Sequence, residues 1–439
     1  MGSVTWGLLG PEQLGSERRT RTLGLGATVR SFNDLAVPGL GGVWFGKQLL
    51  LATLGIAVAE NLRDSGRRSQ NIEVANAVEA LACSLALQDK NTPLRDPRLR
   101  GTRKLDRKKD SLSFATVRRP SFYVTQPMRQ ATVQPLRALG LVESNGERFN
   151  AFRCTERGED FIEEGFLGCR PHSHSVLHHL LTWANQINEP LKTSPELTRA
   201  LSPLQPMPSR AREFLRERVI QGGATEAYTR RKAMDWVETL RGQMHRPIEW
   251  DEKPAMLDEP HWRDLHAGAL FFATRDAAIT LLDEIESHIG NARDRRLSLN
   301  GTFPGNITDK IESLREHAKN FLADNYQGPP REEAAKFCRE CAEPDAAQLL
   351  TNLLLREGHV LKLQSRDIVP SVAFKGSPVR QPEEARSSEE DGMETQVTQR
   401  IPLPEGISHR VPNLFLLNLD LHNELEPWLH PVNNNGGES

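Results

Sequence analysis

One stretch of this chain constrains the fold more than any other, because its glycine, turn and capping residues set the order of four local elements. It runs from Thr132 to Ile162 and reads TVQPLRALGLVESNGERFNAFRCTERGEDFI. A helix is expected to end at Leu139, with Gly140 in the left-handed conformation that favours glycine after a helix. Two short strands joined by a turn follow, and Thr155 is a typical cap for the next helix. The prediction is therefore helix, glycine, hairpin, helix.

This order of elements is that of a winged helix, and residues 126–165 resemble the MarR/PadR-type bacterial regulators. The resemblance is carried by residues at the helix exit and after the hairpin: Leu136, Leu139, Gly140, Leu141, Val142, Thr155, Arg157 and Gly158. In such proteins the helix before the glycine lies in the major groove, and basic wing residues reach phosphate or the minor groove. The resemblance therefore implies double-stranded DNA as the partner.

The resemblance also gives candidate contact residues, since glutamine and arginine make paired hydrogen bonds to base edges. On the expected helix and the wing these candidates are Gln126, Arg129, Gln130, Gln134, Arg137, Arg148 and Arg153. Pro135 lies inside the expected helix and removes one backbone hydrogen bond, which predicts a short or kinked helix. We therefore expect contact mainly with the phosphate backbone and little base preference.

A basic segment precedes this module. Between Arg95 and Arg137 twelve basic residues stand against three acidic ones, although the whole chain has a net charge of −2. Such a run is either a solvated loop or the electrostatic footprint of nucleic-acid binding, and its position favours the second interpretation. The candidates for phosphate contact in this segment are Arg103, Lys104, Arg107, Lys108, Lys109, Arg118 and Arg119.

The rest of the chain predicts a mainly α, multi-domain helical protein around a central winged-helix (α+β) module. A length of 439 residues exceeds what one hydrophobic core usually serves, and apolar residues recur at helical spacing on both sides of the module. The expected divisions are an N-terminal helical region with a glycine-rich lead and a basic end (1–110), the winged-helix module (111–170), a helical domain (171–376), an acidic disordered linker (377–400) and a C-terminal strand and tail (401–439).

The tail is expected to contain a strand, because apolar and polar residues alternate from Asn413 to Leu421. An apolar strand after a tether usually docks on its own domain, and capture by a partner's sheet edge is the alternative. Protein partners are expected through the helical domain or through the tail at 411–430.

Two further segments exclude classes of function. Gly41–Gln48, GGVWFGKQ, has the glycine spacing of a phosphate loop, but Gln48 replaces the hydroxyl residue that would hold magnesium, so no nucleotide site is expected. Leu40–Ala59 is apolar but interrupted by Lys47, which predicts a buried helix and no membrane span.

Five cysteines, an odd number, together with no signal peptide, predict a reducing, cytoplasmic location.

No arrangement of residues predicts catalysis, and no cofactor is expected. Histidines and cysteines offer one zinc hypothesis, with His172, His174, Cys338 and Cys341 as ligands, against the simpler interpretation of a solvated helix start and buried helix cysteines. The expected function is non-catalytic DNA binding by a subunit of a larger bacterial assembly, in antiviral defence or mobile-element biology. The alternatives are a helical scaffold whose winged helix docks a protein, and a metal-dependent enzyme that uses the region from His172 to His179.

Overall fold

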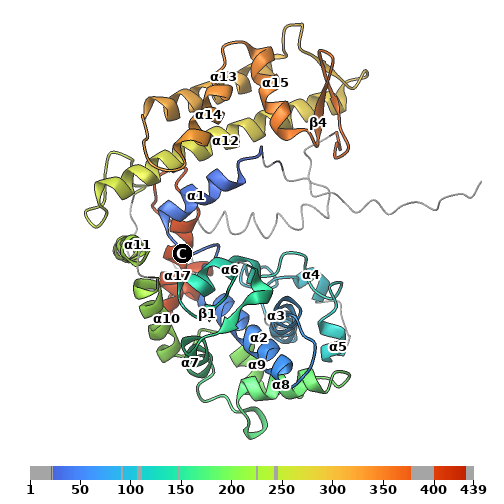
Figure 1. The fold of residues 1–439 in the computed structure, drawn as a ribbon, viewed down its shortest axis with the longest axis vertical. Coiled ribbons are helices and arrows are strands. Elements are labelled where there is room, and N and C mark those ends of the chain that lie inside the picture. Colours follow the sequence, from blue (N-terminus) through green and yellow to red (C-terminus); the bar gives the residue numbers. More distant parts are fainter. Residues whose placement is uncertain are drawn as a thin grey trace, which may run out of the picture. The chain divides into compact units, whose positions relative to one another are not determined.

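The computed structural model describes residues 21, 23–89, 92–105, 111–146, 148–223, 226–241, 246–376 and 400–431, and these are mainly helical, as predicted (Figure 1). They form two compact units. Unit 1 comprises Met1–Ser31 and Leu270–Gln381, and unit 2 comprises Phe32–Ala269 and Pro382–Ser439. Among the described residues no helix combines the length and the apolar character that crossing a membrane requires.

Unit 2 is built around two helices that pack side by side, α2 (Gly46–Asp64) and α3 (Asn71–Ala86) (Figure 1). Nearly every residue of α2 up to Ala59 is buried, so the apolar segment noted in the sequence is a core helix. The two helices approach closely at Gly55, where an added Cβ would lie 2.5 Å from the Cα of Ala75. Only a glycine allows the helices to pack at that distance.

Shorter helices surround this pair and complete unit 2. They are α1 (Gly26–Ala36, whose last residues belong to this unit), α4 (Thr102–Leu105), α5 (Phe114–Val117), α6 (Arg129–Ala138), α7 (Glu156–Gly165), α8 (Val176–Asn185), α9 (Pro195–Leu201), α10 (Ser209–Gln221) and α11 (Ala227–Thr239), with the 3₁₀ turns η1 (Phe149–Ala151) and η2 (Pro171–Ser173). The long helix α12 (Glu259–Asn291) runs across the boundary between Ala269 and Leu270. The segment 171–376, expected as one helical domain, is thus divided between the two units, because the periodicity of a continuous helix carries no boundary signal.

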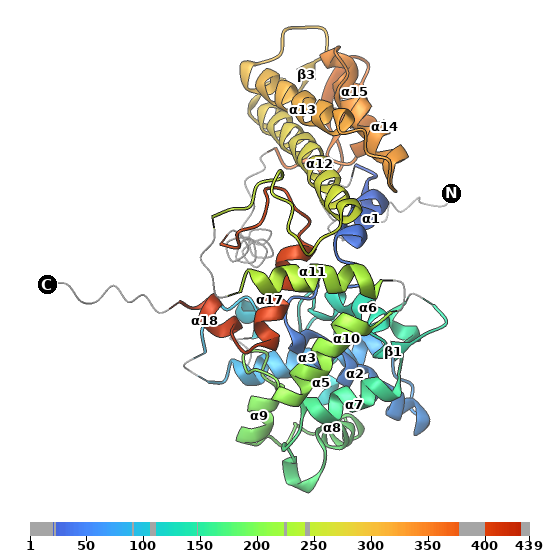
Figure 2. The same cartoon turned by 90° about the vertical axis from the view of Figure 1, so that its left-hand side faces the viewer.

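The expected strand at Asn413–Leu421 is wrong, since these residues lie in the helix α17 (Arg410–Leu421), followed by α18 (Leu425–Leu429). All residues of α17 except Asn413 are buried, and the helix packs against α10 and α11 of its own unit (Figure 2). The alternation that suggested a strand comes from Asn418 and Asp420, two polar residues that are buried with partners. The Asn418 amide, for example, donates to the Glu238 carboxylate over 2.8 Å.

Unit 1 combines the C-terminal part of α12 with three helices and a small antiparallel sheet. The helices are α13 (Gly305–Ala323), α14 (Arg331–Cys341) and α15 (Ala346–Glu357), and the strands β3 (Leu297–Ser298), β4 (Leu361–Gln364) and β5 (Asp367–Pro370) pair in the order β3-β5-β4. Phe271 lies at the centre of its core, in edge-to-face contact with Phe321 and Phe337. The expected acidic linker falls on 377–399, outside the described residues, and on Arg400.

Candidate nucleic-acid interface

The segment from α6 to α7 contains the local elements that the sequence predicted. Gly140 follows α6 with a φ of 71°, and β1 (Val142–Glu143) pairs antiparallel with β2 (Arg153–Cys154). The Thr155 hydroxyl then accepts a hydrogen bond from the Gly158 backbone N–H over 3.2 Å and caps α7. The glycine and the cap act on residues close in sequence and form where they were expected, whereas the returning strand, expected from Phe149 to Cys154, is reduced to β2 because Phe149–Ala151 form the 3₁₀ turn η1.

The start of α6 is held by a side chain that the sequence did not point to. The Glu79 carboxylate of α3 accepts hydrogen bonds from the backbone N–H groups of Met128 and Arg129, over 2.7 and 3.0 Å, and from the Tyr123 hydroxyl over 2.8 Å. A carboxylate at this position suits the positive end of the helix. Burial raises the pKa of Glu79, while these hydrogen bonds and the nearby Arg129 oppose the rise. The contact fixes α6 against α3.

Pro135 does not break α6, because the carbonyl group that it leaves without a helical partner is used elsewhere. The Ala131 carbonyl accepts a hydrogen bond from the Gly42 backbone N–H over 3.3 Å. An added Cβ at Gly41 would lie 2.7 Å from the same carbonyl oxygen and 2.8 Å from the Cδ of Pro135. The loop before α2 therefore covers this side of α6, and α6 does not present it to a DNA groove.

Two of the five candidates around α6 are engaged inside the protein. The Arg129 guanidinium donates to the Asn76 amide oxygen and lies 5.3 Å from the centre of the Phe149 ring. The Gln134 amide donates to the Asp34 carboxylate over 2.5 Å. Both side chains therefore stabilise the fold, and a DNA contact would compete with these bonds.

The other three candidates form the solvent-facing strip of α6 and the turn before it. Gln126, Gln130 and Arg137 are exposed, although the Gln130 amide donates to the Thr125 carbonyl over 3.1 Å. This strip carries one positive charge. Taken alone, it provides a narrow and weakly charged surface for a duplex.

The hairpin beside α6 is fixed against the first turn of α3. The Asn71 side chain, which is fully buried, donates hydrogen bonds to the carbonyl groups of Phe149 and Phe152 over 2.9 and 2.8 Å. The Ile72 backbone N–H donates to the Asn150 side chain over 2.9 Å. These bonds hold the hairpin, with its exposed wing candidates Arg148 and Arg153, against the first residues of α3, directly after the turn that joins α2 and α3.

That turn supplies two arginines that are not among the candidates predicted from the sequence. Arg67 and Arg68 are exposed on it, at the edge of a cleft of about 490 Å³ that also includes Arg63 and Glu73. The Arg67 guanidinium donates to the Asn185 carbonyl over 3.1 Å, which holds the turn in place. The adjacent arginines after a glycine were a visible signal, but they lie far from the wing in sequence.

The candidates of the upstream basic segment differ in their exposure and in their partners within the fold. Arg118 pairs with Glu73 over 3.2 Å, which places it at the same cleft, and Arg119 beside it is exposed. Lys104 donates to the Tyr123 carbonyl over 2.5 Å, and Arg103 is exposed on α4. The candidates Arg107, Lys108 and Lys109 lie outside the described residues.

We call the resulting surface the arginine face. Its members come from the α2–α3 turn, the segment after α5 and the hairpin, and they are Arg67, Arg68, Arg118, Arg119, Arg148 and Arg153. Three carboxylates oppose part of this charge: Glu73 pairs with Arg118, Glu60 lies 3.9 Å from the Arg153 guanidinium, and the exposed Glu143 stands opposite Arg153 in the β1–β2 pair. The face therefore keeps a net positive charge.

The proposed zinc ligands belong to two different units. His172 and His174 precede α8 in unit 2, whereas Cys338 and Cys341 are buried on α14 in unit 1. Burial raises the pKa of both thiols, that of Cys338 to about 12, so both remain protonated at neutral pH.

The described part of the chain has one group of three potential metal ligands with the right spacing, Asp96, Glu426 and His430. The Arg98 guanidinium donates hydrogen bonds to both carboxylates, over 2.6 Å to Asp96. Because this cation already pairs with both carboxylates, the arrangement is an ion-pair network that ties α18 to the segment before α4.

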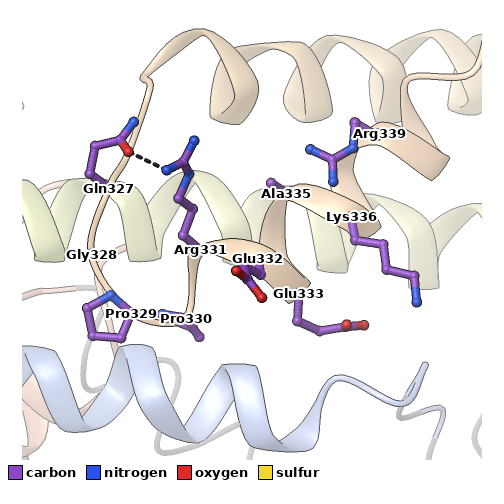
Figure 3. A pocket seen from close by; sticks show the side chains of 10 residues that line it. All are labelled: Gln327, Gly328, Pro329, Pro330, Arg331, Glu332, Glu333, Ala335, Lys336 and Arg339. Carbon is purple, nitrogen blue, oxygen red and sulfur yellow. Dashed lines mark hydrogen bonds between the residues drawn. The ribbon is translucent and has the colours of Figure 1, made fainter.

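A separate cleft of about 1020 Å³ lies at the start of α14 in unit 1 (Figure 3). Arg331 donates a hydrogen bond to the Gln327 side chain there, and the helix presents both acidic and basic side chains to the cleft: Glu332, Glu333, Lys336 and Arg339. This mixture of charges favours neither an anion nor a cation, so the cleft indicates no ligand class.

Comparison with known proteins adds no relative: no protein family model, curated protein or solved structure matches this chain. The function is therefore inferred from the residues and contacts of the chain itself.

Proposed function

We propose that this protein binds double-stranded DNA through the arginine face, contacts mainly the phosphate backbone and performs no catalysis. The observation that carries the proposal is the pair of hydrogen bonds from Asn71 to Phe149 and Phe152. These bonds hold the hairpin that carries the wing arginines against the start of α3, which directly follows the turn that carries Arg67 and Arg68. A preformed cluster of arginines binds phosphate oxygens without first having to be ordered.

In this proposal α6, β1, β2 and α7 act as a winged helix whose wing makes the main contact. Helix α6 is unsuited to lie deep in the major groove, because the loop around Gly42 covers one side of it and Gln134 is bound to Asp34. Phosphate contacts position a protein on the duplex but carry little sequence information. The proposed binding is therefore tolerant of DNA sequence.

The direct experiment measures binding to a fluorescent duplex of mixed sequence by anisotropy at low salt. We expect the wild type to bind, and we expect Arg67→Ala, Arg68→Ala, Arg148→Ala and Arg153→Ala together to weaken binding by roughly 100-fold or more, since each phosphate contact adds to affinity. The matched control removes four exposed arginines of unit 1, namely Arg293, Arg331, Arg339 and Arg366, and should bind like the wild type.

Failure of the wild type to bind at low salt would overturn the proposal, as would equal losses in the two quadruple variants. Either result would favour the scaffold alternative, in which the same module docks a protein. A thermal melt of each variant confirms that unit 2 is folded.

A further inference from the structure

Arg21 lies inside unit 1, among three carboxylates that are distant from it in the chain. Its Nε atom donates a hydrogen bond to Asp283 over 3.0 Å, and its Nη2 atom donates to Glu286 over 2.6 Å. Its Nη1 atom lies 3.5 Å from a carboxylate oxygen of Glu357. Asp283 and Glu286 belong to α12, and Glu357 is the last residue of α15. We call these three acidic residues the carboxylate cluster.

The contact between Arg21 and the carboxylate cluster is almost fully removed from solvent. The side chain of Arg21 is 5% exposed, that of Glu286 is 0% exposed and that of Glu357 is 2% exposed. Buried carboxylates without a cation lose their hydration and repel each other. A guanidinium keeps its charge when buried and offers five N–H donors in one plane, so it can serve several carboxylates at once.

The two buried carboxylates are held in place by contacts other than Arg21. Glu286 accepts hydrogen bonds from the backbone N–H groups of residues 375 and 376, over 3.1 and 3.3 Å. Glu357 accepts hydrogen bonds from the backbone N–H groups of residues 360 and 361, over 2.9 and 3.0 Å. Because these bonds do not depend on the cation, the site is preformed, and a ligand that enters it does not have to order the carboxylates first.

Arg21 leaves part of the binding capacity of the cluster unused. Its Nη1 atom is buried and has no hydrogen-bond partner among the residues that the structure describes. The 3.5 Å from this atom to Glu357 is longer than a charge-assisted hydrogen bond. The backbone of Arg21 limits where its guanidinium can lie, whereas a free guanidinium ion can turn toward the carboxylates.

A second arginine of unit 1 lies close to the same segment but serves other partners. The Arg356 guanidinium donates to the carbonyl group of the buried Leu23 over 3.3 Å, and it pairs with Glu333 and Glu340. Arg356 therefore helps to hold the segment that leads into α1, while Arg21 supplies the cation of the carboxylate cluster.

We propose that the carboxylate cluster is a guanidinium-binding site, which Arg21 fills in cis and which an alkylguanidinium ion or an arginine side chain fills in trans when Arg21 is absent. Filling the site in cis fastens the segment before α1 to α12 and α15. A lysine ammonium is a poorer ligand, because it is a single point charge without the planar fork of donors. The site belongs to unit 1 and is separate from the arginine face.

The test is thermal unfolding of the full chain with Arg21→Ala, without DNA, in the presence and absence of about 20 mM ethylguanidinium chloride. Loss of the cation should lower the melting temperature by roughly 5 °C or more, because buried carboxylates are left unpaired. Ethylguanidinium should recover roughly 2–4 °C of this loss. It should leave the wild type unchanged, since Arg21 already fills the site, and ethylammonium chloride should recover nothing.

Two variants serve as controls for the recovery. Arg296→Ala removes an exposed arginine of unit 1 that pairs with Asp294 and Asp367, so it should cost little stability and should not respond to ethylguanidinium. Glu286→Gln added to Arg21→Ala removes one charge of the site but keeps an oxygen for the backbone N–H groups, and it should abolish the recovery.

Arg21→Lys keeps the test decisive if Arg21→Ala does not fold. This variant retains the charge but lacks the planar fork, and it should melt below the wild type. The proposal is overturned if either Arg21 variant is as stable as the wild type. It is also overturned if ethylammonium recovers as much stability as ethylguanidinium, or if Glu286→Gln leaves the recovery intact.

Discussion

The carboxylate of Asp420 accepts a hydrogen bond from the backbone N–H of Gly46 over 2.8 Å, which joins α17 near the end of the chain to the first residue of α2. A helix N-terminus is a natural site for an anion, and here the protein's own carboxylate occupies it. The Gln48 side chain also accepts a hydrogen bond from the Trp44 backbone N–H over 2.9 Å. The backbone groups that a phosphate loop would offer to a nucleotide are therefore used within the fold.

We expect Asp420→Ala to destabilise unit 2 by roughly 2–4 kcal/mol. The substitution leaves a buried backbone N–H without its acceptor and removes the negative charge near the buried Lys47. Urea unfolding monitored by circular dichroism measures the loss. Asp420→Asn is the control, because its amide oxygen can still accept the bond and the expected loss is smaller. Wild-type stability in Asp420→Ala would contradict this account of α2.

Lys47 predicts a specific pH dependence of stability. Its side chain is buried and donates to the Ala200 carbonyl, and burial lowers its pKa to about 8. Above pH 8 the folded chain has released this proton while the unfolded chain, with an ordinary lysine pKa near 10.5, still holds it. The unfolded state then binds more protons, so the free energy of unfolding rises with pH, by up to roughly 1.4 kcal/mol per unit.

The free energy of unfolding of the wild type and of Lys47→Met, measured with denaturant from pH 7 to pH 10, tests this pH dependence. The difference in stability between the wild type and the variant should shift in favour of the wild type as the pH rises. A difference that stays constant across this range would show that Lys47 keeps its proton in the folded state.

Gly41 provides a test of the contact between the loop before α2 and helix α6 at Ala131 and Pro135. Gly41→Ala should destabilise the protein by about 2–3 kcal/mol, since the new Cβ meets the Ala131 carbonyl at 2.7 Å and the φ of 60° disfavours alanine. Gly66→Ala is the matched control: its φ is also positive, at 83°, but nothing lies within 4 Å of the added atom. Thermal unfolding should show a clearly larger loss for Gly41→Ala, and equal losses would mean that the loop does not pack as described.

Asn71 is expected to control the order of the hairpin. Asn71→Leu leaves the Phe149 and Phe152 carbonyl groups without their donor, at a cost of about 1–3 kcal/mol in stability. Hydrogen exchange should accelerate at residues 148–154 more than at α7. Affinity for DNA should also fall, although Asn71 itself is fully buried and cannot touch a phosphate. Unchanged exchange in the hairpin would refute the positioning role.

The sequence predicts features of this fold that depend on near neighbours. Gly140 ends α6 and Thr155 caps α7 because each acts on residues within one helical turn. The Glu79 cap of α6 and the Asp420 cap of α2 join residues far apart in the chain, and neither leaves a local pattern. The α17 segment has the alternation of a strand because its polar residues Asn418 and Asp420 are buried and bond to distant partners, Glu238 and Gly46, and do not face solvent.

Long-range contacts that leave no local pattern also determine the candidate interface. The wing arginines Arg148 and Arg153 could be identified from the local element order, but the position of their hairpin at the start of α3 depends on the contact with Asn71. Arg129 and Gln134 have suitable chemistry for DNA contact, and only the folded chain shows that both have internal partners. Residue type indicates what a side chain can bind, whereas its partners decide whether it is available.

The salt dependence of DNA affinity tests the central proposal most directly. For the wild type on a duplex of mixed sequence, the logarithm of the binding constant should fall against the logarithm of salt concentration with a slope of roughly −4 to −5, as four to six phosphate contacts require. The variant that lacks Arg67, Arg68, Arg148 and Arg153 should show a slope shallower by about 3, while the unit 1 control keeps the wild-type slope. A wild-type slope near zero, or the same slope in all three proteins, would contradict binding through the arginine face.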